Sequence, residues 1–335
     1  MTNAESDLRL SSDLAETSNL PNVIAALFVL IYCIAFLTLK FETHGINRFH
    51  LLFIGAIFTS YFLLPLSRKL ILIAFPMAFY GMMYDFFQYI PFSSLMPIRV
   101  SEPYHIDLHL FGVFSSGQLT PLHEYVHQLL NSPFFDLFCG FIYMMHIPVV
   151  IVLLLSFWRF GSDELAAKFI FAFWLMNIFA FATYFFYPAA APWFVSKYGF
   201  LQPLVAMPGD PAGLARFDQI LGLNFFTQNY QISPVPFGAI PSMHAGFSML
   251  GFLYSFQLSR KLSYWLGFYC ASMWFSALYL QHHYLIDVIL GVLYALLAYW
   301  IVEKFLKKGF LKVFRTLKTQ LVEQGSFTLF HPKKL

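Results

Sequence analysis

Long apolar blocks constrain the fold of this chain more strongly than any other feature of its sequence. Hydrophobic residues make up 59% of its 335 residues and charged residues only 11%, which is far from the composition of a soluble globular domain. A helix of about 20 mostly apolar residues is long enough to cross the hydrocarbon core of a bilayer. Eight blocks approach this length, at residues 22–39, 49–66, 70–90, 135–157, 167–187, 239–257, 262–280 and 284–303. The sequence therefore predicts an all-α integral membrane protein, built as a polytopic helical bundle.

We expect roughly six to eight true spans, because Pro65, Arg68 and Lys69 leave only a tight turn between the second and third blocks. The polar N-terminus lacks a basic region followed by a small-residue cleavage site, so no removable signal peptide is expected. The predicted organisation is a polar N-terminal tail, N-terminal transmembrane helices, an interfacial loop, a catalytic transmembrane core containing a long loop at 188–238, and a basic cytoplasmic tail. These parts occupy residues 1–21, 22–90, 91–134, 135–303 and 304–335. Cysteines in apolar stretches are expected to be buried free thiols, and this applies to Cys33, Cys139 and Cys270.

The positions of the basic residues predict how the chain is oriented in the membrane. They lie between the fourth and fifth blocks, between the sixth and seventh, and in the C-terminal tail, and include Arg159, Lys168, Arg260 and Lys261. By the positive-inside rule these segments are cytoplasmic. The loops at 91–134 and 188–238 then emerge on the opposite, non-cytoplasmic face. The net charge of +3 is small and dispersed, so no nucleic-acid partner is expected.

Two histidine motifs lie at the mouths of the sixth and eighth blocks. In Pro241-Ser242-Met-His244, the serine can cap the following helix and free backbone N–H groups can face an anion. His283 and Asp287 are four residues apart, so the carboxylate can fix the imidazole tautomer and leave the other ring nitrogen as a nucleophile or base. One histidine to attack phosphorus and one to protonate the leaving oxygen are what two-step phosphoryl transfer needs without a metal.

Non-catalytic interpretations of these two motifs are also possible. The histidine and aspartate can form a satisfied structural pair at the membrane interface. They can also act as a proton relay in a transporter, although relay groups would be spaced through the bilayer rather than gathered at one end of the spans.

Metal binding is the remaining alternative for the histidines. His244, His282, His283 and Asp287 could form a ligand set, but adjacent histidines on a helix point about 100° apart and do not easily share one ion. By count alone the better zinc candidate is a group of polar residues between 105 and 127: His105, Asp107, His109, His123, Glu124 and His127. These residues equally suit an interfacial loop followed by an amphipathic helix. We therefore expect no metal and no cofactor.

The two histidine motifs, Pro241-Ser242-Met-His244 and His283 with Asp287, resemble those of the type 2 phosphatidic acid phosphatase (PAP2) superfamily. Its members carry Pro-Ser-x-His and His-x3-Asp motifs on neighbouring helices. Where the phosphatase branch has Ser-Arg before the second histidine, this chain has Ser276-Ala277, a departure shared by the lipid phosphotransferase branch. Three longer sequence segments, at 191–194, 207–218 and 234–246, are similar to those of fungal inositol phosphorylceramide synthase and its bacterial relatives. The similarity extends over residues 91–291.

The resemblance implies an activity and a set of roles. His283 would attack the phosphodiester of phosphatidylinositol, with Asp287 holding its ring, while His244 would protonate the departing diacylglycerol oxygen. Ceramide or a related lipid alcohol would then take up the phosphoinositol group. The enzyme would be a multi-pass protein of a bacterial inner membrane, or of the Golgi membrane in a fungus, with its active site on the non-cytoplasmic face. A PAP2-type lipid phosphate phosphatase, with water as acceptor, is the nearest alternative, and oligomeric state is not predicted.

With Ala277 where an arginine is usual, another group must neutralise the phosphate as charge builds in the transition state. Arg216 is the first choice, although a loop salt bridge with Asp210 or Asp218 would also account for it. The complete set of substrate-binding candidates is basic side chains and the capping serine: Arg216, Ser242, Arg99 and Lys197.

Overall fold

The computed structural model describes residues 30, 31, 33, 34, 77, 80, 81, 83, 84, 86, 96–203, 207–233 and 235–305. The chain divides into two compact units, Met1–Met82 with Leu306–Leu335, and Met83–Phe305. The expected spans at 22–39, 49–66 and 70–90 and the basic tail lie wholly or largely outside the described residues. All further description concerns the second unit, except that Cys33 of the first unit, like Cys139 and Cys270, is a buried free thiol as predicted.

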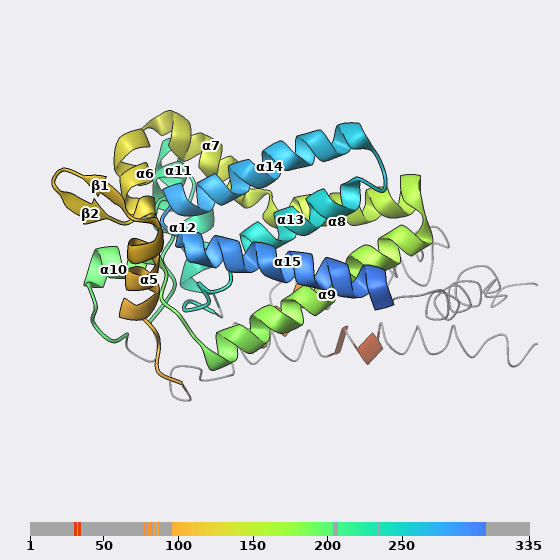
Figure 1. The fold of residues 1–335 in the computed structure, drawn as a ribbon, viewed down its shortest axis with the longest axis horizontal. Coiled ribbons are helices and arrows are strands. Elements are labelled where there is room, and N and C mark those ends of the chain that lie inside the picture. Colours follow the sequence, from red (N-terminus) through yellow and green to blue (C-terminus); the bar gives the residue numbers. More distant parts are fainter. Residues whose placement is uncertain are drawn as a thin grey trace, which may run out of the picture. The chain divides into compact units, whose positions relative to one another are not determined.

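The described part of the second unit is mainly helical (Figure 1). Its helices are α5 (Ser101–Phe111), α6 (Leu122–Leu130), α7 (Pro133–Met144), α8 (His146–Ser156) with a π-helical turn (Phe157–Gly161), α9 (Asp163–Phe186), α10 (Pro192–Tyr198), α11 (Leu214–Leu221), α12 (Phe225–Gln231), α13 (Met243–Ser255), α14 (Arg260–Tyr279) and α15 (Leu285–Phe305). A short antiparallel hairpin, β1 (Val113–Ser115) and β2 (Gln118–Thr120), follows α5.

Local sequence explains where several of the longer helices begin. Ser162, Ser242 and Ser259 precede α9, α13 and α14, and each side chain accepts a hydrogen bond from the backbone N–H three residues later. A serine in this position satisfies one of the N–H groups that a helix start leaves without an intrahelical partner. The cap that the sequence predicted at Ser242 is therefore present.

Two of the described helices, α9 and α15, are long and apolar enough to cross a bilayer. The pair α7 and α8 would make a third span, but it is bent by 46° at the break near Met145. The span expected at 135–157 is therefore interrupted, and Pro148, in the first turn of α8, has no N–H for the carbonyl of Met144. The expected span at 239–257 is also shorter, since α13 begins only after Ser242 and has 13 residues.

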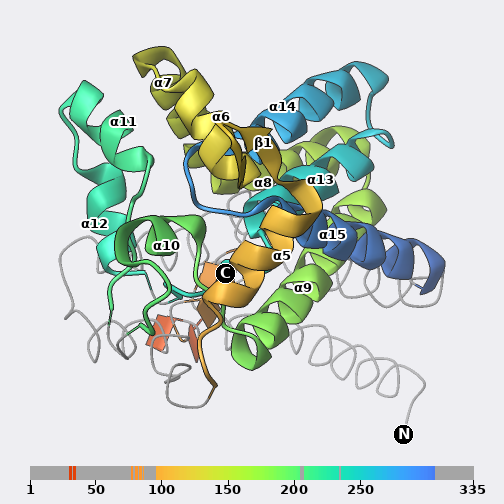
Figure 2. The same ribbon diagram turned by 60° about the vertical axis from the view of Figure 1, so that its left-hand side comes forward.

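The long helices α9, α13, α14 and α15 run alongside one another, and α13 packs against the other three. The shorter elements α5, α6, α10, α11 and α12 and the hairpin gather at one end of this group (Figures 1 and 2). Two glycines allow α13 and α15 to approach closely: a Cβ at Gly291 would overlap the carbonyl oxygen of Ser242, and one at Gly246 would lie 3.1 Å from the carbonyl oxygen of Gly291. This contact brings the starts of α13 and α15 together.

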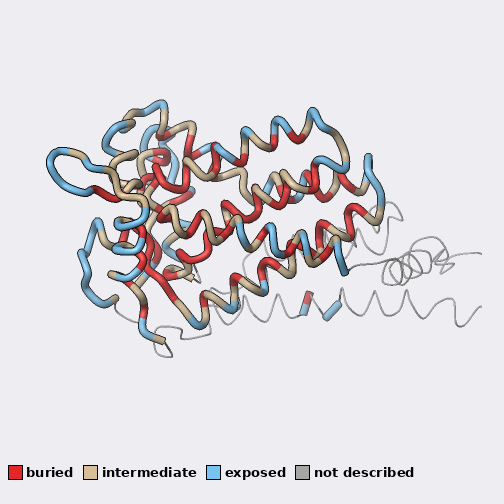
Figure 3. Tube along the Cα trace, viewed as in Figure 1, coloured by how far each residue is buried: buried red, intermediate tan, exposed pale blue. Residues whose placement is uncertain are grey.

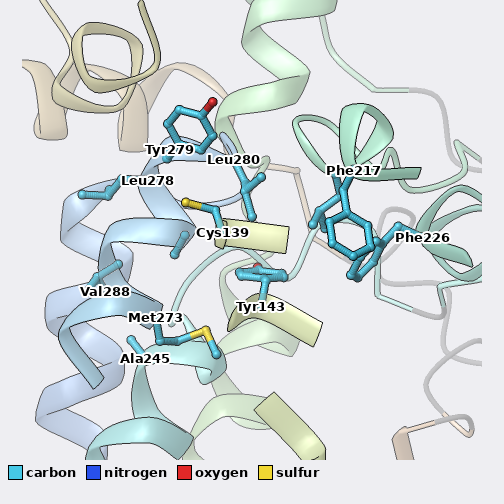
Figure 4. Packing of buried hydrophobic residues seen from close by; sticks show 12 residues of the cluster. Cys139, Tyr143, Phe217, Phe226, Ala245, Met273, Leu278, Tyr279, Leu280 and Val288 are labelled. Atoms are coloured by element: carbon cyan, nitrogen blue, oxygen red, sulfur yellow. The ribbon is translucent and has the colours of Figure 1, made fainter. Parts of the chain in front are cut away.

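Buried residues line the inner sides of the long helices and continue into the end where the short elements gather (Figure 3). One core cluster joins α7, α11, α13 and α14 there (Figure 4). Within it the rings of Phe217 and Phe226 meet edge to face at 5.5 Å, and Tyr143 is almost fully buried. The packed core thus extends up to the loops that carry both histidine motifs.

Candidate active site

Three segments from distant parts of the chain pair with one another beside His283. The Arg99 N–H donates to the Pro188 carbonyl at 2.8 Å, and the Ala189 N–H donates to the Phe237 carbonyl at 2.8 Å. Residue 189 therefore lies between residues 99 and 238 and forms a parallel bridge with each of them. This arrangement fixes the carbonyl of Ala239, which follows directly in the chain.

His283 is held in one orientation by two acceptors on the same ring nitrogen. Its Nδ1 lies 3.0 Å from the Ala239 carbonyl oxygen and 3.3 Å from Oδ2 of Asp287. Because both partners are acceptors, Nδ1 must carry the proton, and in the neutral ring Nε2 is then the unprotonated nitrogen. The residue is 6% exposed. A buried imidazole with a free Nε2 lone pair is suited to act as a nucleophile.

Asp287 belongs to the first turn of α15 and is fully buried. Its Oδ2 also accepts from the N–H of Tyr284 at 2.9 Å. The carboxylate therefore bonds to the helix start and to His283 through one oxygen, as the four-residue spacing predicted.

The turn between α14 and α15 positions His283 for these hydrogen bonds. The N–H of Gln281 donates to Leu278 and the N–H of His282 donates to Ala277, the two hydrogen bonds of a Schellman C-cap. Gln281 takes the left-handed position, with φ of 60°, which glycine usually fills. The N–H of His283 also donates to Ala277 at 3.1 Å. The backbone of Ala277 thus anchors the turn at the place where phosphatases carry an arginine side chain.

His244 occupies the first turn of α13, with its ring centre 5.6 Å from that of His283. A hydrogen bond of 3.1 Å links its Nδ1 to the hydroxyl of Tyr143, and the two rings stack with centroids 3.9 Å apart. The His146 ring lies 4.4 Å from it. The structure therefore brings together the two histidines that the sequence singled out, and it adds Tyr143 and His146.

Sequence reasoning missed Tyr143 and His146 because both lie in the block interpreted as one apolar span. A signal was present: an ionisable residue within a predicted membrane segment points to a functional position, and His146 lies beside the proline that bends this span.

His282 has a different set of partners from those of His283. Its Nε2–H donates to the Pro211 carbonyl at 3.0 Å, and its ring stacks on Tyr230 at 4.7 Å and Tyr143 at 5.2 Å. Burial, reinforced by the nearby His283 ring, lowers the pKa of His282 to about 3. A neutral His282 therefore forms part of the wall of the site.

Within the described residues, no three His, Cys, Asp or Glu side chains converge in a way that could hold a metal ion. The six residues considered as a zinc candidate do not converge on one point. Asp107 bonds to the backbone of Ile286, His127 bonds to Arg216, and His105 and His109 are exposed. Burial lowers the pKa of His123 to about 3, so this ring is neutral.

Arg216 has a different carboxylate partner from those expected. Its Nη2 forms an ion pair of 2.7 Å with Asp136 of α7, and its Nη1 donates to Asn131 and to Nε2 of His127, each at 3.1 Å. Asp210 and Asp218 were wrong as partners, because Asp210 pairs with Lys197 and Asp218 accepts the N–H groups of 226 and 227 at the start of α12. No hydrogen bond joins Arg216 to either site histidine among the described residues.

The other two basic candidates are also paired. Arg99 is 3.1 Å from Glu102, and its guanidinium lies over the Tyr187 ring. Lys197 is 2.5 Å from Asp210, and this hydrogen bond raises the pKa of Lys197 despite some burial. Of the four substrate-binding candidates, only Ser242 bonds directly to the first turn of α15, since its N–H donates to the carbonyl of Asp287 at 2.9 Å.

The paired helix starts bring the buried His283–Asp287 pair and His244 together in a protein with helices long and apolar enough to cross a membrane. The chain belongs to the PAP2 superfamily, whose sequence profile matches residues 118–301. The chain is 32% identical over 299 residues to phosphoinositol dihydroceramide synthase of Bacteroides thetaiotaomicron, covering 88% of this chain and 95% of that protein.

Fungal proteins are similar over a shorter part of their length. Inositol phosphorylceramide synthase of Candida albicans is 28% identical over 253 residues, and the corresponding catalytic subunit of Schizosaccharomyces pombe is 26% identical over 241 residues. These alignments cover 75% and 72% of this chain but only 52% and 55% of the fungal proteins. No solved structure matches the chain significantly. The family and its named relatives make the chain a lipid phosphotransferase.

Proposed function

We propose that this enzyme transfers phosphoinositol from phosphatidylinositol to ceramide or a related lipid alcohol, through a phosphohistidine at His283, and releases diacylglycerol. The observation that carries the proposal is the double hydrogen bond at Nδ1 of His283, which leaves Nε2 free to attack. The names of the relatives from Bacteroides and Candida support the choice of an inositol phospholipid donor and a ceramide-type acceptor.

In the first step, Nε2 of His283 forms a bond to phosphorus while the bond from phosphorus to the diacylglycerol oxygen breaks. His244 gives a proton to that oxygen, so diacylglycerol leaves as a neutral alcohol. The N-phosphorylated ring still carries its Nδ1 proton and is therefore cationic. The buried carboxylate of Asp287, 3.3 Å from Nδ1, stabilises that cation.

In the second step, the acceptor hydroxyl attacks the same phosphorus and the bond to Nε2 breaks. His244, left neutral by the first step, takes the hydroxyl proton. The product is an inositol phosphate diester of the acceptor lipid, and both histidines return to their starting states. Its hydrogen bond with Tyr143 keeps His244 oriented through both transfers.

The phosphate itself must be held by groups other than the arginine used in phosphatases. The first-turn N–H groups of α13, beside Ser242, can donate hydrogen bonds to an anion there, and Arg99, Lys197 and Arg216 are the cationic candidates. We place this site on the non-cytoplasmic face, since Arg159, Lys168, Arg260 and Lys261 lie toward the other ends of the helices.

Turnover by purified enzyme tests the proposal. Phosphatidylinositol labelled in the inositol ring is mixed with ceramide in detergent, and products are separated by chromatography. We expect a labelled sphingolipid and, on rapid acid-free quenching, inositol label bound to the protein. Release of labelled inositol phosphate with or without ceramide would instead identify a hydrolase, and no turnover at all would contradict both activities.

A further inference from the structure

A buried carboxylate outside the histidine motifs bonds to the helix that carries Asp287. Asp107 of α5 is completely buried, and its Oδ1 accepts a hydrogen bond of 2.9 Å from the N–H of Ile286. The two residues are 179 positions apart in the chain. Burial raises the pKa of Asp107, while hydrogen bonds from the N–H groups of Ile286 and Leu285 act in the opposite direction.

The start of α15 explains why an outside acceptor is needed. Its capping position is Tyr284, and Asp287, three residues later, accepts from the Tyr284 N–H at 2.9 Å. This is one half of a capping box. In a complete box the capping residue's own oxygen returns the bond to the first-turn N–H groups, but a tyrosine hydroxyl lies too far from its backbone to do so. Asp107 supplies the missing acceptor from α5.

The capping box and the catalytic pair share one oxygen. Oδ2 of Asp287 accepts both from Tyr284 N–H and from Nδ1 of His283. Fraying of this turn would therefore move the carboxylate relative to the His283 ring. The ring of His123 also packs edge to face on Tyr284, with centroids 5.2 Å apart. Residues of both α5 and α6 therefore contact the start of α15.

We propose that Asp107 is a positioning residue, which caps α15 across the chain and thereby holds Asp287 in line with His283. The inference rests on the proposed function of the His283 site. Asp107 does not touch phosphate in this scheme; it acts on kcat through the geometry of the turn at 284–287.

The test compares Asp107→Ala, Asp107→Asn and a matched control, His109→Ala, on the same helix. His109 is exposed and bonds only to the carbonyl of His105 one turn earlier among the described residues. Asparagine keeps an oxygen that can cap the helix, whereas alanine does not. Transfer from phosphatidylinositol to ceramide is measured at varied concentrations of each lipid. In parallel, amide hydrogen exchange is followed by mass spectrometry in peptides covering 284–290.

We expect Asp107→Ala to lower kcat by about 10- to 100-fold with little change in either KM, and to speed exchange at 284–290. Asp107→Asn should recover most of kcat and of the exchange protection, and His109→Ala should match the wild type. Equal loss of kcat in the asparagine and alanine variants, or normal kcat in Asp107→Ala, would overturn the proposal. If Asp107→Ala does not fold, the asparagine variant still decides, because its kcat and exchange must both stay near those of the wild type.

The exchange measurement separates this inference from the proposed function. Failure of the wild-type protein to transfer phosphoinositol would count against the proposed reaction. Unchanged exchange at 284–290 in folded Asp107→Ala would count against the cap, whatever reaction the enzyme catalyses.

Discussion

At the residue scale, the orientation of His283 depends on a backbone carbonyl as much as on its aspartate. The Ala239 oxygen is closer to Nδ1 than the carboxylate oxygen is, at 3.0 Å against 3.3 Å. The carbonyl can fix the tautomer by itself, so we propose that the distinct contribution of Asp287 is its negative charge beside the cationic phosphohistidine of the proposed reaction. The two contributions can be separated by substitution.

Asp287→Asn removes the charge and keeps an oxygen acceptor. We expect kcat to fall by about 10²- to 10³-fold, while His283→Ala falls to the level of the uncatalysed reaction because no nucleophile remains. Steady-state transfer assays on folded, membrane-extracted protein measure both. An Asp287→Asn variant with normal kcat would show that the charge is not used, and appreciable turnover by His283→Ala would reject the nucleophile.

Arg216 combines a structural role with a proposed binding role. Removing it leaves Asp136, whose side chain is 5% exposed, without its cation. We expect Arg216→Ala to lower stability by about 2 to 3 kcal/mol, a partial value because the guanidinium is itself 29% exposed. The double variant Arg216→Ala with Asp136→Asn should regain stability. If activity returns with stability, Arg216 only supports the fold; if activity stays low, the arginine also serves the phosphate.

A buried neutral histidine predicts a loss of stability in acid. The pKa of His123 is lowered by burial from 6.5 to about 3, so below pH 6.5 the unfolded chain binds a proton that the folded chain does not. Stability therefore falls as pH decreases from about 6.5 toward 3, by at most about 1.4 kcal/mol per pH unit for this residue. His123→Phe keeps the ring contact with Tyr284 and should show a smaller drop in Tm between pH 7 and pH 5 than the wild type. An identical drop would contradict this account.

At the scale of elements, the close contact between α13 and α15 brings the two histidine motifs together. The boundaries of two helices followed from the sequence: α14 and α15 begin and end within two residues of the expected blocks. The break between α7 and α8 did not, because hydropathy averages over the single proline that interrupts the hydrogen bonding. It is this break that places Tyr143 and His146 against His244.

Gly291 is the position at which a side chain would separate those helices. Gly291→Ala places a methyl group on the Ser242 carbonyl, and we expect it to cost about 1 to 3 kcal/mol of stability and to lower kcat, since both motifs must move apart. Gly267→Ala is the matched control, because there the new methyl meets only the ring of Phe252 at 3.2 Å or more. Tm and transfer rate are measured for both. Equal effects of the two substitutions would argue against a special role for the α13–α15 contact.

At the scale of the whole molecule, the second unit has two chemically different ends. The histidine site lies where α13 and α15 begin. Toward the other ends of α9 and α15, Lys168 pairs with Glu303 at 3.0 Å and Glu164 at 3.4 Å. The basic residues that predict a cytoplasmic side lie toward this second end, and on this ground we propose that the histidine site faces the opposite side of the membrane.

Labelling of single introduced cysteines tests this orientation. All three native cysteines are buried, so background labelling by an impermeant maleimide should be low. Gln118→Cys in the hairpin at the site end is expected to react in sealed, right-side-out vesicles, and Lys261→Cys only after the membrane is permeabilised. The reverse pattern would place the active site in the cytoplasm.

The sequence by itself determined the chemistry that the protein can carry and the medium in which it folds. Apolar blocks and the spacing of His244, His283 and Asp287 are local properties of the chain, so a membrane-embedded phosphoryl-transfer enzyme could be predicted from them. Only the tertiary structure decided the rest: the Ala239 carbonyl on Nδ1 of His283, the cap from Asp107 to α15, and Asp136 rather than Asp210 or Asp218 as the partner of Arg216. Each of these joins residues tens to hundreds of positions apart. Such pairs depend on how the helices pack and on which buried polar groups need partners. Local sequence specifies neither the packing nor the partners.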